Sequence, residues 1–148
     1  MDPLKQIVQM DDDGMLFLSA AIQDWNPIAN LGIETVIDLD GGVDQGVPEI
    51  ADKSLYIYLP IADGNLPDLN RLHAVAKLGA DLIRQNHRVL THCGVGLNRS
   101  ALMAGLILRY LGLDAQTTIQ QCRQRRPGAL YNPVFAEYLA NCSMPALA

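Results

Sequence analysis

The residues with the clearest chemical potential lie in one stretch, which reads His-Cys-Gly-Val-Gly-Leu-Asn-Arg-Ser over positions 92–100. An apolar, β-branched run precedes it and a longer apolar run follows it, so we expect a strand, a tight turn and a helix. Such a turn points successive backbone N–H groups into one concavity, where the positive end of the helix also favours an anion. Arg99 adds two forked donors, and the same surroundings favour the thiolate of Cys93. The stretch therefore predicts an anion cradle with a nucleophile at its base.

Glycine supports this interpretation, because a residue without Cβ lets the backbone approach a ligand closely. A lone buried cysteine is usually only a small apolar residue. Here, however, average residue usage makes the full pattern a coincidence on the order of one in ten thousand for a chain of this size. We expect the anion to be bound by the backbone of Gly94, Val95, Gly96, Leu97 and Asn98 together with the Arg99 side chain.

The elements that must position this turn follow from the pattern of the chain. Strands alternate with helices after residue 33, which predicts an α/β fold with helices on both faces of a parallel sheet. Two short apolar runs before that point, around a turn of Asp and Gly, predict an antiparallel hairpin at the N-terminal edge. We therefore expect a central, mostly parallel sheet of four to five strands, and a loop over residues 40–53 on the ligand side.

Helix signals are clear in the second half of the chain. An amphipathic stripe predicts a helix from Pro67 or Asn70 to Gln85, and an apolar run after Ser100 predicts a buried central helix. Two further helices are expected to begin at residues 114 and 132. In the first of these, Cys122 is expected in the core. The basic end of that helix (Arg123, Arg125 and Arg126) is expected to complement its C-terminal dipole.

Length and composition restrict the class of protein. The chain of 148 residues predicts a single domain over 1–148, and its N-terminus lacks a secretory signal. Its apolar runs are too short for a membrane span. Three cysteines argue against a disulfide framework and favour a reducing, cytoplasmic setting. The net charge is −5, with acidic residues concentrated before residue 69 and basic ones after it. Because nucleic acid and anionic membranes need a broad basic surface, we do not expect either as a partner.

The loop resembles the His-Cys-x-x-Gly-x-x-Arg-Ser signature of cysteine-dependent phosphatases. The order of elements, with the cysteine two-thirds along, is similar to that of the dual-specificity branch of the protein tyrosine phosphatase superfamily. The tail from Arg126 through Asn132 to Phe135 extends this resemblance over nearly the whole chain. It implies a hydrolase of phosphotyrosine, and of phosphoserine and phosphothreonine, in proteins. It implies neither a metal nor another cofactor.

The resemblance also implies roles for individual residues. Cys93 attacks phosphorus to form a phosphocysteine, Arg99 holds the oxygens, and Ser100 stabilises the sulfur as it leaves. His92 orients the loop and tunes the thiolate. In this family an aspartate about thirty residues before the cysteine is the general acid. Asp63 fits this spacing, and Asp68, before a helix, is the alternative. Asp38 and Asp40 are interpreted as structural.

Two other functions are consistent with the signature. The first is a phosphatase of another substrate, either a phosphoinositide or an RNA 5′-triphosphate. The uncharged residues of the loop argue against the former, and the general acid argues against the latter. The second is a non-catalytic module that binds phosphorylated partners, which would normally have lost the cysteine or the arginine. The expected ligands are a phosphorylated protein or peptide, and phosphate or its oxyanion analogues.

Overall fold

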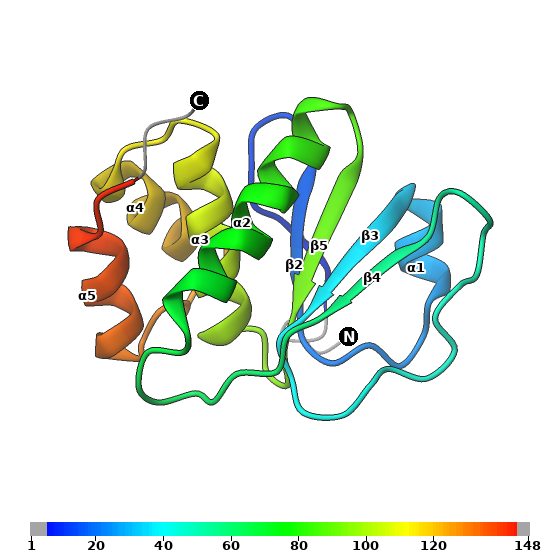
Figure 1. The fold of residues 1–148 in the computed structure, drawn as a ribbon, viewed down its shortest axis with the longest axis horizontal. Helices are drawn as coiled ribbons and strands as arrows, with labels where there is room; N and C mark the ends of the chain where they lie inside the picture. Colours follow the sequence, from blue (N-terminus) through cyan, green and yellow to red (C-terminus); the bar gives the residue numbers. More distant parts are fainter. Residues whose placement is uncertain (1–5, 145–148) are drawn as a thin grey trace.

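Five strands form one sheet through the molecule, in the order β1-β2-β5-β3-β4 (Figure 1). The structure is a computed structural model that describes residues 6–144. Neighbouring strands are parallel except β1 and β2, which form an antiparallel hairpin at one edge. The predicted sheet and edge hairpin are therefore confirmed. The strands are β1 (Val8–Gln9), β2 (Leu16–Ser19), β3 (Ile33–Asp38), β4 (Leu55–Tyr58) and β5 (Arg88–His92).

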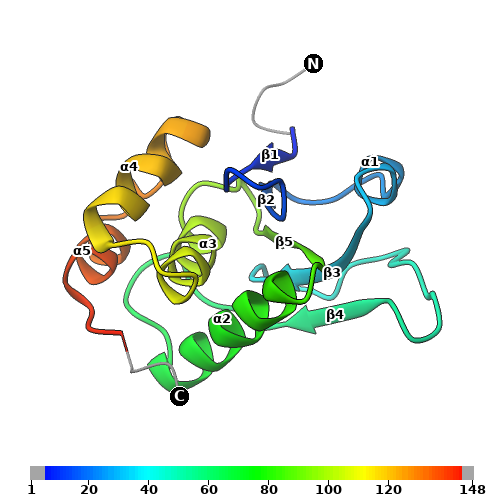
Figure 2. The same ribbon diagram turned by 90° about the horizontal axis from the view of Figure 1, so that it is seen from above.

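Helices cover both faces of this sheet, as predicted (Figure 2). The short helix α1 packs against one face, and the other four helices form a thicker layer on the opposite face. In residues 6–144, no helix combines the length and the apolar character that crossing a membrane requires. The helices are α1 (Asn26–Asn30), α2 (Leu69–Arg84), α3 (Arg99–Tyr110), α4 (Ala115–Arg125) and α5 (Pro133–Asn141).

The alternation of side chains along the strands divides the core in two. Successive side chains of a strand point to opposite faces of the sheet. Leu16 and Leu18 of β2 belong to the large core on the side of α2 and α3, whereas Phe17 between them packs with Ile28 of α1. Residues 100–108 of α3 are all buried, which confirms the central position predicted for this helix.

Strand register brings the predicted loops to one edge of the sheet. Asp38 at the end of β3 lies opposite His92 at the end of β5, so both strands finish at the same level. The turn into α3 and the loop after β3 therefore start side by side. The first of the two apolar runs predicted to form the hairpin yields only a short strand, because it pairs with β2 only through Val8 and Gln9.

Candidate active site

A buried arginine binds backbone carbonyl groups of the turn between β5 and α3. Arg126 is 2% exposed, and its guanidinium donates to the carbonyl oxygens of Gly96 and Val95, each at 2.9 Å. In a planar trans peptide the N–H points opposite to the carbonyl. The N–H of Gly96 belongs to the same peptide as the Val95 carbonyl, and it donates to Sγ of Cys93 at 3.2 Å. Arg126 thus turns the amide of this peptide toward the sulfur.

The neighbouring peptide groups of the turn are oriented in the same way. The carbonyl of Gly94 accepts from the N–H of Ala21 at 3.2 Å, and the carbonyl of Leu97 accepts from the N–H of Leu130 at 2.8 Å. Four successive carbonyls of the turn therefore bond outward, and the amides of residues 95–98 face the other way. These amides belong to four of the five residues whose backbone was predicted to bind the anion, and the binding itself stays a prediction.

Gly96 is required by the backbone at this point. Its φ is +74°, in the left-handed region, and a Cβ there would lie 2.8 Å from the backbone of Ser19 and Ala20. Any other residue would have to push β2 and the turn apart. The glycine at 96 therefore sets how closely the turn packs on the end of β2.

Cys93 lies at the floor of the turn and is 2% exposed. Its Sγ is 3.2 Å from Oγ of Ser100, which is fully buried in the first turn of α3. The carbonyl of Ser100 accepts from the Thr91 hydroxyl at 3.0 Å, which ties α3 to β5. The structure thus brings together the predicted nucleophile and the predicted stabiliser of its leaving sulfur.

Arg99 lies beside the cradle and is held by the loops after β3 and β4. Its Nη1 donates to Oδ1 of Asp40 at 3.1 Å and to the carbonyl of Ile61 at 3.4 Å. Asp40 was interpreted as a structural residue. Its carboxylate contacts the signature arginine, so it belongs to the site and orients the guanidinium fork.

One ring nitrogen of His92 contacts a group of acidic side chains. Its Nε2 lies 2.6 Å from Oδ2 of Asp44 and 3.5 Å from Oδ1 of Asp38. Tyr56 links the two acids, because its hydroxyl donates to Asp38 and accepts from the N–H of Asp44. Burial raises the pKa of Asp44, against the opposing effect of His92. These contacts fix the orientation of the imidazole ring, and the role of His92 in the loop stays a prediction.

The same group is the place where the described residues could hold a metal ion. Ligand atoms of Asp38, Asp44 and His92 lie within 4.8 Å of one another. Hydrogen bonds among them and with Tyr56 already account for their positions. Asp38 also accepts from the N–H of Asp40 at 2.9 Å, so the group adjoins the residue that pairs with Arg99.

Two candidate acids were predicted, and the structure gives them different neighbours. The Asp63 carboxylate accepts from Nδ2 of Asn98, a residue of the turn, at 3.0 Å. Asp68 is instead the N-cap of α2 and pairs with Arg71 at 2.6 Å. A hydrogen bond from the N–H of Arg71 lowers the pKa of Asp68, which keeps it ionised as a helix cap. Of the two, Asp63 is the carboxyl group that touches the cradle.

Three residues of the site were not predicted from the sequence. Arg126 was assigned to the helix dipole, together with Arg123 and Arg125. It instead supports the cradle, while Arg125 pairs with Asp12 and Arg123 donates to the carbonyls of residues 129 and 130. Asn132 was interpreted as a helix start within the tail that resembles the family, and Asp44 lay in the loop predicted over residues 40–53. Its position directly before Pro-Gly is the local feature that sets Arg126 apart from Arg123 and Arg125 in the sequence.

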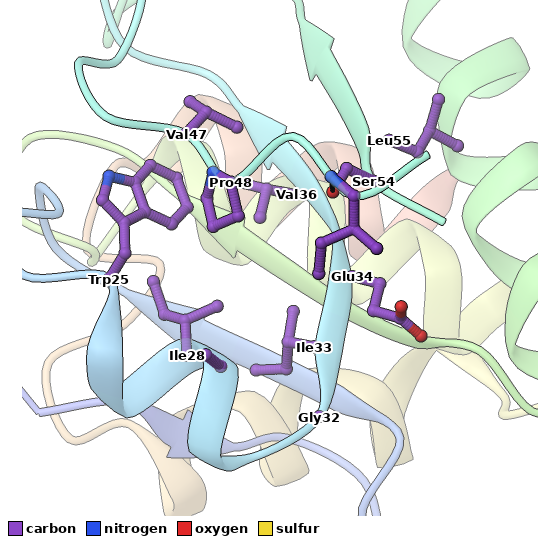
Figure 3. A pocket seen from close by; sticks show the side chains of 12 residues that line it. Trp25, Ile28, Gly32, Ile33, Glu34, Val36, Val47, Pro48, Ser54 and Leu55 are labelled. Carbon is purple, nitrogen blue, oxygen red and sulfur yellow. Dashed lines mark hydrogen bonds between the residues drawn. The ribbon is translucent and has the colours of Figure 1, made fainter. Parts of the chain in front are cut away.

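An apolar cavity elsewhere in the fold is distinct from this site. It has a volume of about 190 Å³ and lies between α1, β3 and the loop after β3 (Figure 3). Trp25, Ile28 and Val47 line it, and the indole of Trp25 also donates to the carbonyl of Gln45. Part of its lining comes from Gly32, Ile33 and Leu55, at the starts of β3 and β4. The amides of the cradle lie at the other ends of the strands.

Comparison with known proteins decides the family. The family model for the dual specificity phosphatase catalytic domain matches residues 16–143, which is most of the chain. The chain belongs to the dual-specificity phosphatase family. The resemblance predicted from the signature loop is therefore confirmed, and so is the fold class.

One relative matches part of this chain in sequence, and solved structures share its fold at low identity. Cyclin-dependent kinase inhibitor 3 from Rattus norvegicus is 35% identical over 69 residues, which is 45% of this chain and only 32% of the rat protein. Human DUSP28 has a TM-score of 0.75 at 23% identity, covering 90% of this chain and 89% of its own. A mouse putative dual specificity phosphatase, solved with zinc tungstate, has a TM-score of 0.73 at 21% identity, covering 90% and 83%.

Proposed function

We propose that this phosphatase hydrolyses phosphotyrosine, and more slowly phosphoserine and phosphothreonine, in proteins through a phosphocysteine intermediate. The observation that carries the proposal is that Cys93 directly after β5, Arg99 at the start of α3 and Asp63 in the loop after β4 all lie at one cradle. We also propose that residues 1–148 act as a single catalytic domain in the cytoplasm. The three cysteines are free thiols, which is in keeping with a reducing compartment.

The first step transfers the phosphoryl group to sulfur. The Cys93 thiolate attacks phosphorus, so that an S–P bond forms while the bond from phosphorus to the ester oxygen breaks. Asp63 gives its proton to that oxygen, which leaves as an alcohol or phenol. Arg99 and the amides of the cradle hold the three equatorial oxygens throughout.

The second step returns the enzyme to its starting state. Asp63, now a carboxylate, takes a proton from a water molecule that attacks phosphorus. The S–P bond breaks, inorganic phosphate leaves, and the thiolate is restored. Ser100, 3.2 Å from Sγ, donates a hydrogen bond to the sulfur as its charge returns. No step requires a metal ion.

The choice of substrate rests on the surroundings of the cradle. The loops over residues 40–53 and 60–67 are short, which favours a shallow site open to tyrosyl, seryl and threonyl phosphates. Asp40 places a carboxylate beside the cradle, and its negative charge would repel the extra phosphates of an inositol headgroup or a triphosphate. The mouse neighbour solved with zinc tungstate supports binding of phosphate-like oxyanions by this chain as well.

A panel of four substrates at matched concentrations tests the proposal. It comprises a phosphotyrosine peptide, a phosphothreonine peptide, a phosphoinositide and a 5′-triphosphorylated RNA. We expect kcat/KM to be highest for phosphotyrosine and Cys93→Ser to abolish every activity. A tenfold preference for lipid or RNA, about 1.4 kcal/mol of transition-state stabilisation, would overturn the protein substrate. Binding of the phosphopeptides without any turnover would identify a binding module instead.

A further inference from the structure

We propose that Asn98 and Asn132 are positioning residues that hold the carboxyl group of Asp63 against the cradle, a proposal that rests on the function proposed above. Nδ2 of Asn98 donates to Oδ2 of Asp63 at 3.0 Å, and Nδ2 of Asn132 donates to Oδ1 at 2.9 Å. Each carboxyl oxygen is therefore held by its own amide. The two amides come from the cradle and from the start of α5.

The backbone fixes which way each amide faces. Oδ1 of Asn98 accepts from the N–H of Asn132 at 2.9 Å, and Oδ1 of Asn132 accepts from the N–H of Val134 at 2.9 Å. Turning either amide over would leave one of these N–H groups facing another donor. Both NH₂ groups must then point at Asp63. The hydrogen bonds therefore fix both asparagine NH₂ groups as donors to the carboxyl group of Asp63.

The two asparagines are buried, whereas the aspartate that they hold is exposed. Asn98 is 3% exposed and Asn132 is 8% exposed, whereas Asp63 lies on an exposed loop between β4 and α2. A buried amide that loses its partner incurs a desolvation cost, so the two asparagines resist release of the carboxyl group. The exposed loop is therefore bound to the cradle at Asp63, the residue that carries the acid.

The same contacts suit both steps of the reaction. A carboxylate only accepts hydrogen bonds, so in the second step both amides can remain in place while Asp63 takes a proton from water. In the first step the protonated oxygen directs its hydrogen at the ester oxygen and keeps a lone pair for an amide. Asn98 immediately precedes Arg99, so the acid and the phosphate-binding arginine share one anchor.

Two variants remove one donor each. Asn98→Ala deletes the side-chain amide that donates to Oδ2 of Asp63. Asn132→Ser deletes the other amide but keeps an oxygen that can cap α5. Because a positioned acid contributes about 10²- to 10⁴-fold to such reactions, we expect each variant to lose about tenfold or more in kcat on phenyl phosphate. The loss should be much smaller on an ester with a good leaving group, which hardly needs the proton. Asn141→Ala, at the exposed end of α5, is the matched control.

A double-variant cycle separates positioning from a general structural role. In an Asp63→Ala background, adding Asn98→Ala should cost nothing further in kcat on either ester. Tungstate affinity should match that of the wild type in Asn132→Ser, because this substitution lies outside the turn and leaves its backbone amides unaltered. An equal loss on all leaving groups, additive losses in the cycle, or weakened tungstate binding in Asn132→Ser would overturn the positioning role. If the wild type hydrolysed no phosphate ester at all, the proposed function itself would fail.

Discussion

Two polar groups, the N–H of Gly96 and the hydroxyl of Ser100, lie at hydrogen-bond distance from the sulfur of Cys93. They differ in when they can act. The Gly96 amide is fixed by the peptide plane that Arg126 holds, so it stabilises negative charge on sulfur at all times. The Ser100 hydroxyl can rotate, so it can strengthen its bond as the charge returns to sulfur in the second step.

Removing that hydroxyl should slow the second step selectively. We expect Ser100→Ala to show a pre-steady-state burst of the alcohol product, followed by a slower steady state, because phosphoenzyme accumulates. Rapid-quench kinetics with an aryl phosphate measures both phases. Equal rates for the two steps in the variant and the wild type would reduce Ser100 to an ordinary residue in the first turn of a helix.

The two candidate acids can be distinguished by substitution. Asp63→Asn should lower kcat on a phosphotyrosine peptide by about 10²-fold or more, since the proton donor to the leaving oxygen is lost. Asp68→Asn should leave kcat nearly unchanged, because that side chain caps α2 and pairs with Arg71 outside the cradle. Steady-state kinetics on both variants decides the assignment. The reverse order of effects would assign the acid to Asp68.

At the scale of elements, the site depends on how closely the turn packs against β2. We expect Gly96→Ala to weaken tungstate binding and to lower kcat/KM by at least tenfold. A Cβ would lie 2.8 Å from the backbone of residues 19 and 20, and alanine rarely adopts a φ of +74°. Isothermal titration with tungstate measures the first effect. Gly64→Ala, where a Cβ meets nothing within 4 Å, is the control. Wild-type tungstate affinity in Gly96→Ala would contradict the packing argument.

Three helices also meet at a histidine away from the site. His73 of α2 contacts the hydroxyl groups of Tyr110 in α3 and Tyr138 in α5 through its two ring nitrogens. Burial lowers the pKa of His73 in the folded state. The unfolded chain therefore takes up the proton first as the pH falls, and this uptake favours unfolding.

The lowered pKa of His73 predicts that the stability of the fold depends on pH. The contribution of His73 is fully present above its ordinary pKa of about 6.5 and declines as the pH falls below that value. We expect Tm to drop more between pH 7 and pH 5 in the wild type than in His73→Gln. Thermal unfolding of both proteins across this range gives the difference. Parallel curves would mean that the imidazole titrates alike in both states.

For the whole molecule, sequence reasoning succeeded where the chemistry is local. Cys93, Arg99 and Ser100 belong to one strand-turn-helix unit, so their spacing alone placed them around one cradle. The sheet was also predictable, because the alternation of side chains and the order of elements restrict it strongly. Asp63 was predicted from the spacing that the family resemblance implies, with Asp68 as the alternative, and the structure shows Asp68 to be the N-cap of α2.

The support for the cradle could not be predicted, because it comes from distant parts of the chain. Arg126 acts 30 residues from Gly96, Asn132 acts 69 residues from Asp63, and Asp44 acts 48 residues from His92. Each of these residues had a sufficient local interpretation as a helix end, a cap or part of a loop. Only the packing of α4, α5 and the loop after β3 around the turn gives them a second role.

The most direct test of the mechanism is to trap the intermediate. The wild-type protein is mixed with a phosphotyrosine peptide labelled in its phosphate, quenched in acid within milliseconds, digested and mapped by mass spectrometry. We predict labelled phosphate on the peptide that contains Cys93 and none in Cys93→Ser. Steady hydrolysis of the peptide without label on Cys93, or with hydrolysis unchanged in Cys93→Ser, would contradict the phosphocysteine mechanism.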